Sequence, residues 1–202
     1  MERRGFLRDI AKGAATLAAG LVPYSVSALL TPGHATPVRN YLRPPGVLKD
    51  DGAFVAACIA CGLCGEVCPP KCIDFHKRDG GFKVNTPYIV AEEKACILCN
   101  KCMEVCPTEA LGVIPREKVD MGLAQIDRTA CYPWVDRGIC GACVSICPMG
   151  EKAIGFKLWN QYQPFIKHGC VGCGLCVEIC PHPLKPIAIV DRAQGSVARH
   201  KV

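Results

Sequence analysis

The cysteines of this chain recur in four motifs of similar spacing, and this repetition limits the folds open to it. Three motifs follow the pattern Cys-x2-Cys-x2-Cys-x3-Cys-Pro and start at Cys58, Cys96 and Cys170. The third motif in chain order starts at Cys131 and has eight residues before Cys140, where the others have two. Because a repeated spacing requires a repeated local backbone, we expect four related structural units.

Short gaps between cysteines place several thiolates around one metal group. Two-residue gaps let a tight loop present three thiolates to one cluster, with backbone N–H groups directed at its sulfurs. The pattern is that of bacterial ferredoxins, in which three cysteines bind one [4Fe–4S] cluster and the fourth serves another. The sequence therefore predicts four [4Fe–4S] clusters. The predicted ligands are Cys58, Cys61, Cys64, Cys68, Cys96, Cys99, Cys102, Cys106, Cys131, Cys140, Cys143, Cys147, Cys170, Cys173, Cys176 and Cys180.

Glycines directly after a motif cysteine, at positions 62, 141 and 174, are expected to adopt backbone angles closed to other residues. Two other classes of protein use many cysteines. A disulfide scaffold would explain their number but not the strict spacing or the four Cys-Pro steps. Zinc ribbons use Cys-x2-Cys pairs separated by longer gaps. Both alternatives are less consistent with the spacing than iron–sulfur clusters.

The formal net charge of +6 could suggest affinity for nucleic acid. Each [4Fe–4S] cluster on four thiolates carries about −2 in its oxidised form, so four clusters would make the loaded protein mildly acidic. Composition thus favours no nucleic-acid partner. We find no nucleophile–base pair, phosphate-binding loop or flavin motif, and electron transfer through clusters needs none. We expect an electron carrier and no enzyme.

The fold class expected is α+β, with two ferredoxin-like modules of short strands and helices around paired clusters and much irregular structure. Strands are predicted at residues 110–114, 122–127, 152–158 and 186–190, and a turn at Gly80-Gly81. The four-cluster domain is expected to span residues 51–192, followed by a tail at 193–202.

The N-terminus has the features of an export signal. Arg3 and Arg4 resemble a twin-arginine motif, and an apolar stretch and small-x-Ala sites at 33–35 and 26–28 follow. We expect residues 1–35 to be a signal peptide, with an amphipathic helix or an uncleaved membrane anchor as alternatives. Residues 36–50, which contain adjacent prolines, are predicted to be a stiff linker.

Cys72 lies outside the motifs. Internal alignment places it opposite Ala110 of the second motif, so we expect a small buried packing position rather than an alternative ligand. Trp134 lies in the expanded gap and is expected to shield that cluster, with partner docking as the alternative. Histidines are expected to be solvated, although they could tune a nearby cluster. The histidines concerned are the four outside the predicted signal peptide: His76, His168, His182 and His200.

The chain resembles the NapG/MauM ferredoxin-type proteins in its paired arginines, in residues 42–46 (LRPPG), in the first motif and in the irregular third motif. The resemblance implies four clusters, held on the sixteen motif cysteines, in a periplasmic protein. It also implies partners: a membrane-bound quinol dehydrogenase or polyferredoxin, the twin-arginine translocase during export, and a periplasmic nitrate reductase or methylamine-oxidising system. Alternatives are a subunit of another molybdenum oxidoreductase complex and a maturation factor.

The sequence leaves open which motifs exchange their fourth cysteines. Sequential pairing joins motif one with two and three with four through short connections. Nested pairing would place motifs two and three between one and four, so that Cys180 completes the Cys58 set and Cys68 the Cys170 set. In that case Cys147 joins the Cys96 set and Cys106 the Cys131 set. We expect the nested arrangement.

Overall fold

The computed structural model describes residues 41–48, 50–157 and 162–192, all within one compact unit. The predicted signal peptide, residues 36–40 of the predicted linker, His200 and the tail at 193–202 lie outside the described residues. No helix among the described residues has the length and apolar character needed to cross a membrane.

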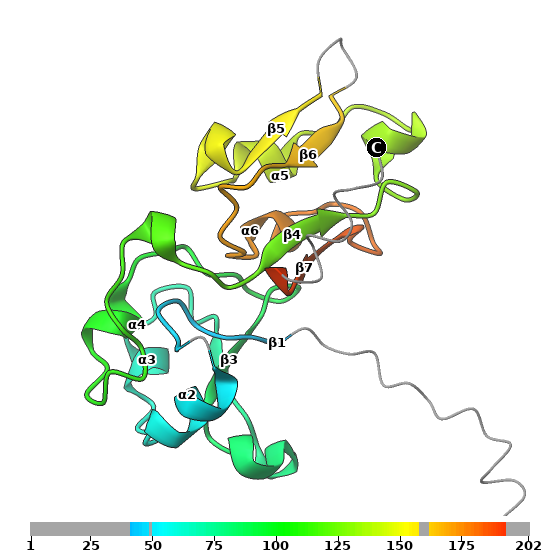
Figure 1. Ribbon diagram of the computed structural model, residues 1–202. Coiled ribbons are helices and arrows are strands. Elements are labelled where there is room, and N and C mark those ends of the chain that lie inside the picture. The colour runs from blue at the N-terminus through cyan, green and yellow to red at the C-terminus, as the bar shows by residue number, and fades with distance from the viewer. Residues whose placement is uncertain (1–40, 49, 158–161, 193–202) are drawn as a thin grey trace, which may run out of the picture. The chain divides into compact units, whose positions relative to one another are not determined.

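The described chain is a small, irregular α+β fold, in agreement with the predicted class (Figure 1). Its strands are β1 (Tyr41–Leu42), β2 (Ile73–Phe75), β3 (Pro87–Val90), β4 (Leu123–Ile126), β5 (Ile154–Phe156), β6 (Pro164–Ile166) and β7 (Ile187–Val190). Its α-helices are α2 (Asp51–Ala57), α3 (Leu63–Glu66), α4 (Lys101–Glu104), α5 (Ala142–Ser145) and α6 (Leu175–Glu178). Its 3-10 turns are η1 (Arg78–Lys83), η2 (Arg116–Lys118), η3 (Tyr132–Val135) and η4 (Gly150–Lys152).

The strands form three antiparallel sheets with the orders β1-β3-β2, β4-β7 and β5-β6. The first half of the described chain (residues 41–114) contains the first sheet, and the second half (residues 123–192) contains the other two. Both halves repeat one order: a strand or bridge, a short helix, a hairpin, a second short helix, and a closing strand or bridge. In the second half β4 and β7 close the unit, with Ile126 opposite Ile187. In the first half a single bridge between Val47 and Leu111 does so.

Two of the four predicted strands are present nearly as expected, as β4 and β7, and β5 is shorter than predicted. Residues 110–114 form no regular strand beyond the bridge at Leu111. The reason lies in the partner segment, because Pro44 and Pro45 have no N–H to donate and Gly46 turns the chain with φ +80°. The chain also turns at Gly81, with φ +58°, as predicted.

The predicted linker is wrong for residues 41–48, which belong to the folded core. Leu42 is buried in β1, and Pro44 and Pro45 are among the most deeply buried side chains. Gly46 lies so close to Met103 that an added Cβ would be 2.5 Å from its Sδ. The adjacent prolines therefore serve packing, and the folded domain includes residues from 41 onward instead of starting at 51.

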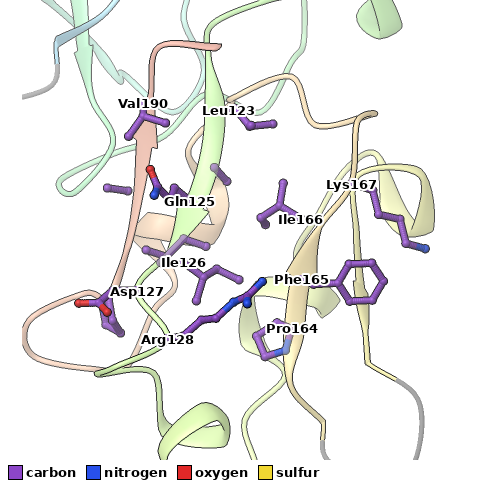
Figure 2. Close-up of a pocket in the computed structure, with 14 residues that line it drawn as sticks. Leu123, Gln125, Ile126, Asp127, Arg128, Pro164, Phe165, Ile166, Lys167 and Val190 are labelled. Atoms are coloured by element: carbon purple, nitrogen blue, oxygen red, sulfur yellow. The ribbon is translucent and has the colours of Figure 1, made fainter. Parts of the chain in front are cut away.

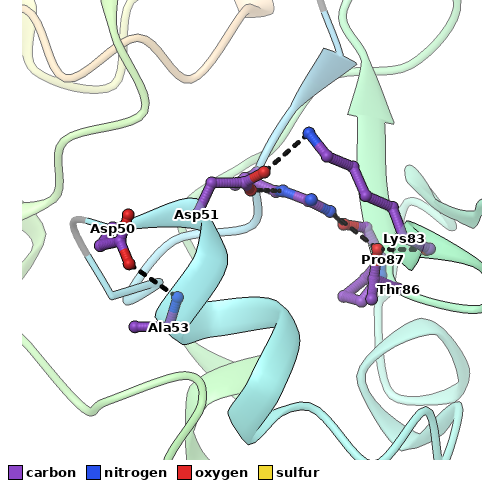
Figure 3. Close-up of polar contacts among 7 residues, drawn as sticks. Asp50, Asp51, Ala53, Lys83, Thr86 and Pro87 are labelled. Carbon is purple, nitrogen blue, oxygen red and sulfur yellow. Dashed lines mark hydrogen bonds and ion pairs between the residues drawn. The ribbon is translucent and has the colours of Figure 1, made fainter. Parts of the chain in front are cut away.

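Arg43 joins this N-terminal segment to α2 and β3. Its Nε donates to Asp51 Oδ1 at 2.7 Å, and its Nη1 donates to Thr86 Oγ1 at 3.0 Å and to the Pro87 carbonyl at 2.9 Å. The guanidinium also lies 4.9 Å from the ring centre of the fully buried Phe54. The hydrogen bond from Arg43 lowers the pKa of Asp51, which Lys83 also contacts at 2.7 Å (Figure 3).

Helix α2 begins at a side-chain cap. Asp50 accepts a hydrogen bond from the Ala53 N–H at 2.8 Å, which satisfies one of the free donors of the first turn (Figure 3). The negative charge of Asp51 in this turn also suits the positive end of the helix dipole.

Candidate metal centres

Each cysteine triplet folds into a loop that leads into a four-residue helix. Helices α3, α4, α5 and α6 each carry the third cysteine of a motif as their second residue. In three motifs the residues before and after the second cysteine have positive φ. They are Ala60 and Gly62, Leu98 and Asn100, and Gly172 and Gly174.

Positive φ is costly for Ala60 and Leu98, so its recurrence at equivalent positions indicates a shared functional constraint. A left-handed residue followed by right-handed helical residues turns successive N–H groups toward one side, a concavity that binds anions and many iron–sulfur clusters. Gly62 and Gly174 are left-handed as predicted.

The same prediction is wrong for Gly141, whose φ is −131°. Glycine is needed there for space, because an added Cβ would lie 2.9 Å from Cζ of Phe156. The irregular third motif thus differs from the other three in backbone conformation as well as in spacing.

Eight of the sixteen predicted ligands lie in the first half of the chain, and they form two groups of four. Cys106 lines the same cavity as the first triplet, and this group is called site 1 (Cys58, Cys61, Cys64 and Cys106). Cys68 lines the same cavity as the second triplet, and this group is called site 2 (Cys68, Cys96, Cys99 and Cys102).

The second half contributes the other two groups. Cys180 acts electrostatically on the pKa of both Cys131 and Cys143, and this group is called site 3 (Cys131, Cys140, Cys143 and Cys180). Cys147 lines the same cavity as the last triplet, and this group is called site 4 (Cys147, Cys170, Cys173 and Cys176).

The pairing is therefore sequential, and the nested arrangement is wrong. Cys180 lies with the Cys131 set instead of the Cys58 set, and Cys68 lies with the Cys96 set. The strand pairing explains this result. Because β4 pairs with β7, and Val47 pairs with Leu111, each half is closed on itself and its two motifs face each other.

Burial and repulsion between neighbouring thiols affect most of the sites. They raise the pKa of Cys64 to about 11, and those of Cys102, Cys143 and Cys173 to about 12. A bound iron core compensates such clustered thiolates with positive charge. Among the described residues, no three histidine, cysteine or acidic side chains are arranged to hold a single metal ion.

Several N–H groups are directed at the sulfurs. The Leu98 N–H donates to Cys96 Sγ at 3.3 Å, and the Ala124 N–H donates to Cys170 Sγ at 3.5 Å. Burial opposes ionisation of Cys106, but donors in residues 108–111 outweigh it and lower its pKa. The chemistry of these sites fits [4Fe–4S] clusters, which need four thiolates and N–H donors to sulfur.

The sequence did not predict these donors. The hydroxyl of Thr108 lies 3.8 Å from Cys106 Sγ, and its position two residues after a fourth cysteine was the available signal. Leu98 and Ala124 act through their main chain, which leaves no trace in residue type.

Cys72 is buried, as is its counterpart Ala110, so the predicted burial is confirmed, and the choice of packing over ligation stays a prediction. Its environment is also more specific than packing requires. Its Sγ lies 3.5 Å from Cys68 Sγ, and its hydrogen bond with Cys96 raises the pKa of Cys72 and lowers that of Cys96. The thiol of Cys72 therefore contacts a sulfur of site 2, that of Cys68.

Trp134 connects the expanded gap of the third motif to β6. Its Nε1 donates to the Pro164 carbonyl at 3.0 Å, and Arg128 and Lys157 lie over its ring at 4.4 and 5.4 Å from the centre. These contacts anchor η3. The shielding of a cluster by Trp134 stays a prediction.

The described histidines differ in their surroundings. His168 is exposed, as expected of a solvated side chain. The ring centre of His76 instead lies 5.2 Å from that of Tyr41 and 4.4 Å from that of Tyr88. The ring centre of His182 lies 4.7 Å from that of Tyr132. His182 therefore lies against the third motif.

Two family models, both described as 4Fe-4S dicluster domains, match the chain. One matches residues 57–110 and again residues 95–151, and the other matches residues 124–181. Matches to two-cluster domains in both halves imply four [4Fe–4S] clusters. The fold and its cysteine sites thus define an iron–sulfur protein of the ferredoxin type.

Similarity to known proteins identifies the family within this class. The ferredoxin-type protein NapG of Escherichia coli K12 is 32% identical over 163 residues, which cover 77% of this chain and 67% of that protein. NapG of Haemophilus influenzae is 32% identical, covering 81% and 58%. The methylamine utilization ferredoxin-type protein MauM of Methylorubrum extorquens is 34% identical, covering 56% and 53%. The chain belongs to the NapG/MauM family of ferredoxin-type proteins.

Proposed function

We propose that this protein is a periplasmic electron carrier that holds one [4Fe–4S] cluster in each of sites 1 to 4. It relays electrons from a membrane-bound quinol dehydrogenase or polyferredoxin toward a periplasmic oxidoreductase, of the nitrate reductase or methylamine utilisation type. It is exported folded by the twin-arginine translocase and works at the membrane surface. The family membership, the sixteen cysteines in four sets and the paired arginines support this proposal.

The contiguity of the four sites is the observation that carries the proposal. The Cys96 N–H donates to the Cys173 carbonyl at 3.1 Å, which joins site 2 to site 4. Cys64 of site 1 raises the pKa of Cys102 in site 2, and Cys143 of site 3 raises that of Cys176 in site 4, both in addition to burial. The sites therefore follow each other in the order 1, 2, 4, 3.

The two sites at the ends of this order lie near the surface. Ile59, between two cysteines of site 1, is 63% exposed, and Ile139, beside Cys140 of site 3, is 80% exposed. Sites 2 and 4, in contrast, have several buried cysteines. A relay needs such a series, with accessible ends and a protected middle.

The protein's own residues bind the clusters and adjust the electrostatic environment of their sulfurs. A bound [4Fe–4S] cluster supplies reversible one-electron exchange. The thiols hold it, the burial of sites 2 and 4 excludes water, and N–H groups such as that of Leu98 stabilise negative charge on sulfur.

The test is anaerobic mixing of the oxidised, loaded protein with quinol-fed membranes of the source bacterium. We expect the visible absorbance of the clusters to bleach, and to return when the oxidised periplasmic fraction and its substrate are added. Membranes without quinol are the control. A protein with full iron content that quinol-fed membranes leave oxidised would contradict the proposed relay.

A further inference from the structure

The cavities of the described chain differ in what they can bind. The cavity of about 700 Å³ beside β4 and β6 is lined mainly by apolar side chains and by no cysteine or histidine (Figure 2). The cavity of site 2, in contrast, is lined by five cysteines, the four of the site and Cys72. A [4Fe–4S] cluster binds four cysteines, so site 2 has one thiol in excess.

The excess thiol lies beside the position of Cys68. The Sγ atoms of Cys68 and Cys72 are 3.5 Å apart, and both side chains are buried. A tight turn brings them together, because the Lys71 N–H donates to the Cys68 carbonyl at 3.1 Å and Lys71 has φ +52°. Since this turn is local, the proximity of the two sulfurs does not depend on the other loops of site 2.

Site 2 is the one site with a fifth thiol, because the other sixteen cysteines of the chain are divided equally among the four sites. Cys72 directly precedes β2. The corresponding residue before a strand or bridge is Ala110 in the second motif, Ala153 in the third and Pro186 in the fourth. The other three sites therefore have no sulfur at this place.

The second motif supplies a close match to the surroundings of Cys72. Ala110 lines the cavity of site 1 together with Cys106, as Cys72 lines that of site 2 together with Cys68. Glu109, before Ala110, has φ +57°, close to the value of its counterpart in the first motif. The two turns are thus equivalent, and they differ in whether a thiol follows them.

Packing alone does not explain the sulfur of Cys72. Alanine fills the equivalent position of site 1, where Ala110 is 1% exposed. A thiolate, in contrast, is a metal ligand. Exchange of one cysteine ligand for another transfers no electron: Cys72 releases a proton to water, and its sulfur forms the bond to iron that Cys68 does not make.

We propose that Cys72 is a reserve ligand of site 2, which binds the cluster when the thiolate of Cys68 is absent. In the wild-type protein Cys68 completes the site and Cys72 stays protonated beside it. That site 2 holds a cluster rests on the function proposed above. The reserve ligand would keep a cluster in the buried middle of the series of sites.

The test compares alanine variants of the equivalent fourth cysteines, in full-length protein purified without oxygen. We expect Cys68→Ala to keep about sixteen irons per chain, because Cys72 replaces the lost ligand. Cys106→Ala has no spare thiol and should fall to about twelve irons, as should the double variant Cys68→Ala/Cys72→Ala. Yields of brown protein should follow the same order.

A transfer of the thiol to site 1 tests the same geometry independently. Cys106→Ala/Ala110→Cys places a cysteine after the equivalent turn, in the cavity of site 1. We expect this variant to regain about sixteen irons, four more than Cys106→Ala alone. This comparison holds even if Cys68→Ala yields no soluble protein.

Several results would overturn the proposal. They are an equal loss of iron or of yield in Cys68→Ala and Cys106→Ala, a [3Fe–4S] signal in the electron paramagnetic resonance spectrum of oxidised Cys68→Ala, and no further loss of iron when Cys72→Ala is added to it. Full iron content in Cys106→Ala, or no regain with Ala110→Cys, would also overturn it. A wild-type protein without a cluster in site 2 would instead contradict the function proposed above, so the two failures are distinguishable.

Discussion

The Sγ atoms of Cys68 and Cys72 lie 3.5 Å apart, although only Cys68 belongs to a four-cysteine site. The interaction of Cys72 with Cys96, another cysteine of site 2, also raises the pKa of Cys72 and lowers that of Cys96. Hydrogen bonds to cluster sulfurs stabilise the reduced, more negative state and raise the reduction potential. This arrangement makes Cys72 a positioning residue for site 2.

We expect Cys72→Ala to retain full iron content but to lower the potential of the site 2 cluster. One hydrogen bond contributes about 0.5–1.5 kcal/mol, which for one electron is roughly 20–60 mV. A potentiometric titration followed by electron paramagnetic resonance measures the shift. Cys72→Ser, which keeps a donor, is the control and should stay closer to wild type. Loss of a cluster from Cys72→Ala would mean that this thiol is a ligand.

Ligand cysteines should matter for folding as well as for electron transfer. Cys61→Ala in site 1 and Cys173→Ala in site 4 each remove one thiolate, and metal-binding energy is also folding energy in a small metalloprotein. We expect a several-fold lower yield of folded protein than for Cys72→Ala, which removes a cysteine outside the sites. Yields of soluble brown protein from matched cultures provide the measurement. Wild-type yields with full iron content would show that these cysteines are dispensable.

Arg43 should contribute to stability because the segment at 41–48 belongs to the core. Lysine has one ammonium group and cannot reproduce the contacts of the guanidinium with Asp51, Thr86 and Pro87. We expect Arg43→Lys to destabilise the protein by about 1–3 kcal/mol. The midpoint of anaerobic urea-induced loss of visible absorbance reports the change, and Arg137→Lys at an exposed site is the control. Equal midpoints for the two variants would contradict the assignment of residues 41–48 to the folded core.

Export is expected to depend on the paired arginines at the N-terminus. Replacing Arg3 and Arg4 with lysine keeps the charge but removes the recognition element of the twin-arginine route. Cell fractionation should then find the brown precursor in the cytoplasm, whereas the wild-type protein accumulates in the periplasm. Periplasmic accumulation of the variant at the wild-type level would reject this route.

The sequence predicted the repeated units because spacing is local: a Cys-x2-Cys-x2-Cys loop has the same requirements wherever it occurs. It also predicted β4 and β7, whose apolar runs are flanked by turn residues. It did not predict β1, because a two-residue strand followed by Pro44 and Pro45 carries the composition of an extended linker. Only the packing of these prolines shows that the segment is part of the core.

The pairing of motifs could not be predicted for a different reason. The lengths of the spacers are compatible with Cys180 in site 3 and with Cys180 in site 1. Long-range strand pairing decides which site Cys180 completes. The register of β4 on β7 brings Ile126 opposite Ile187 and thereby places the fourth motif against the third. Likewise, the interaction with Cys96 that raises the pKa of Cys72 links a residue outside the motifs to the second motif, and it has no local signature.

The content of iron and acid-labile sulfide in anaerobically purified protein tests most directly whether the sixteen cysteines hold four clusters. Four complete ligand sets predict about sixteen irons and sixteen sulfides per chain. Two or fewer clusters in a fully reconstituted sample would contradict the assignment of sites 1 to 4.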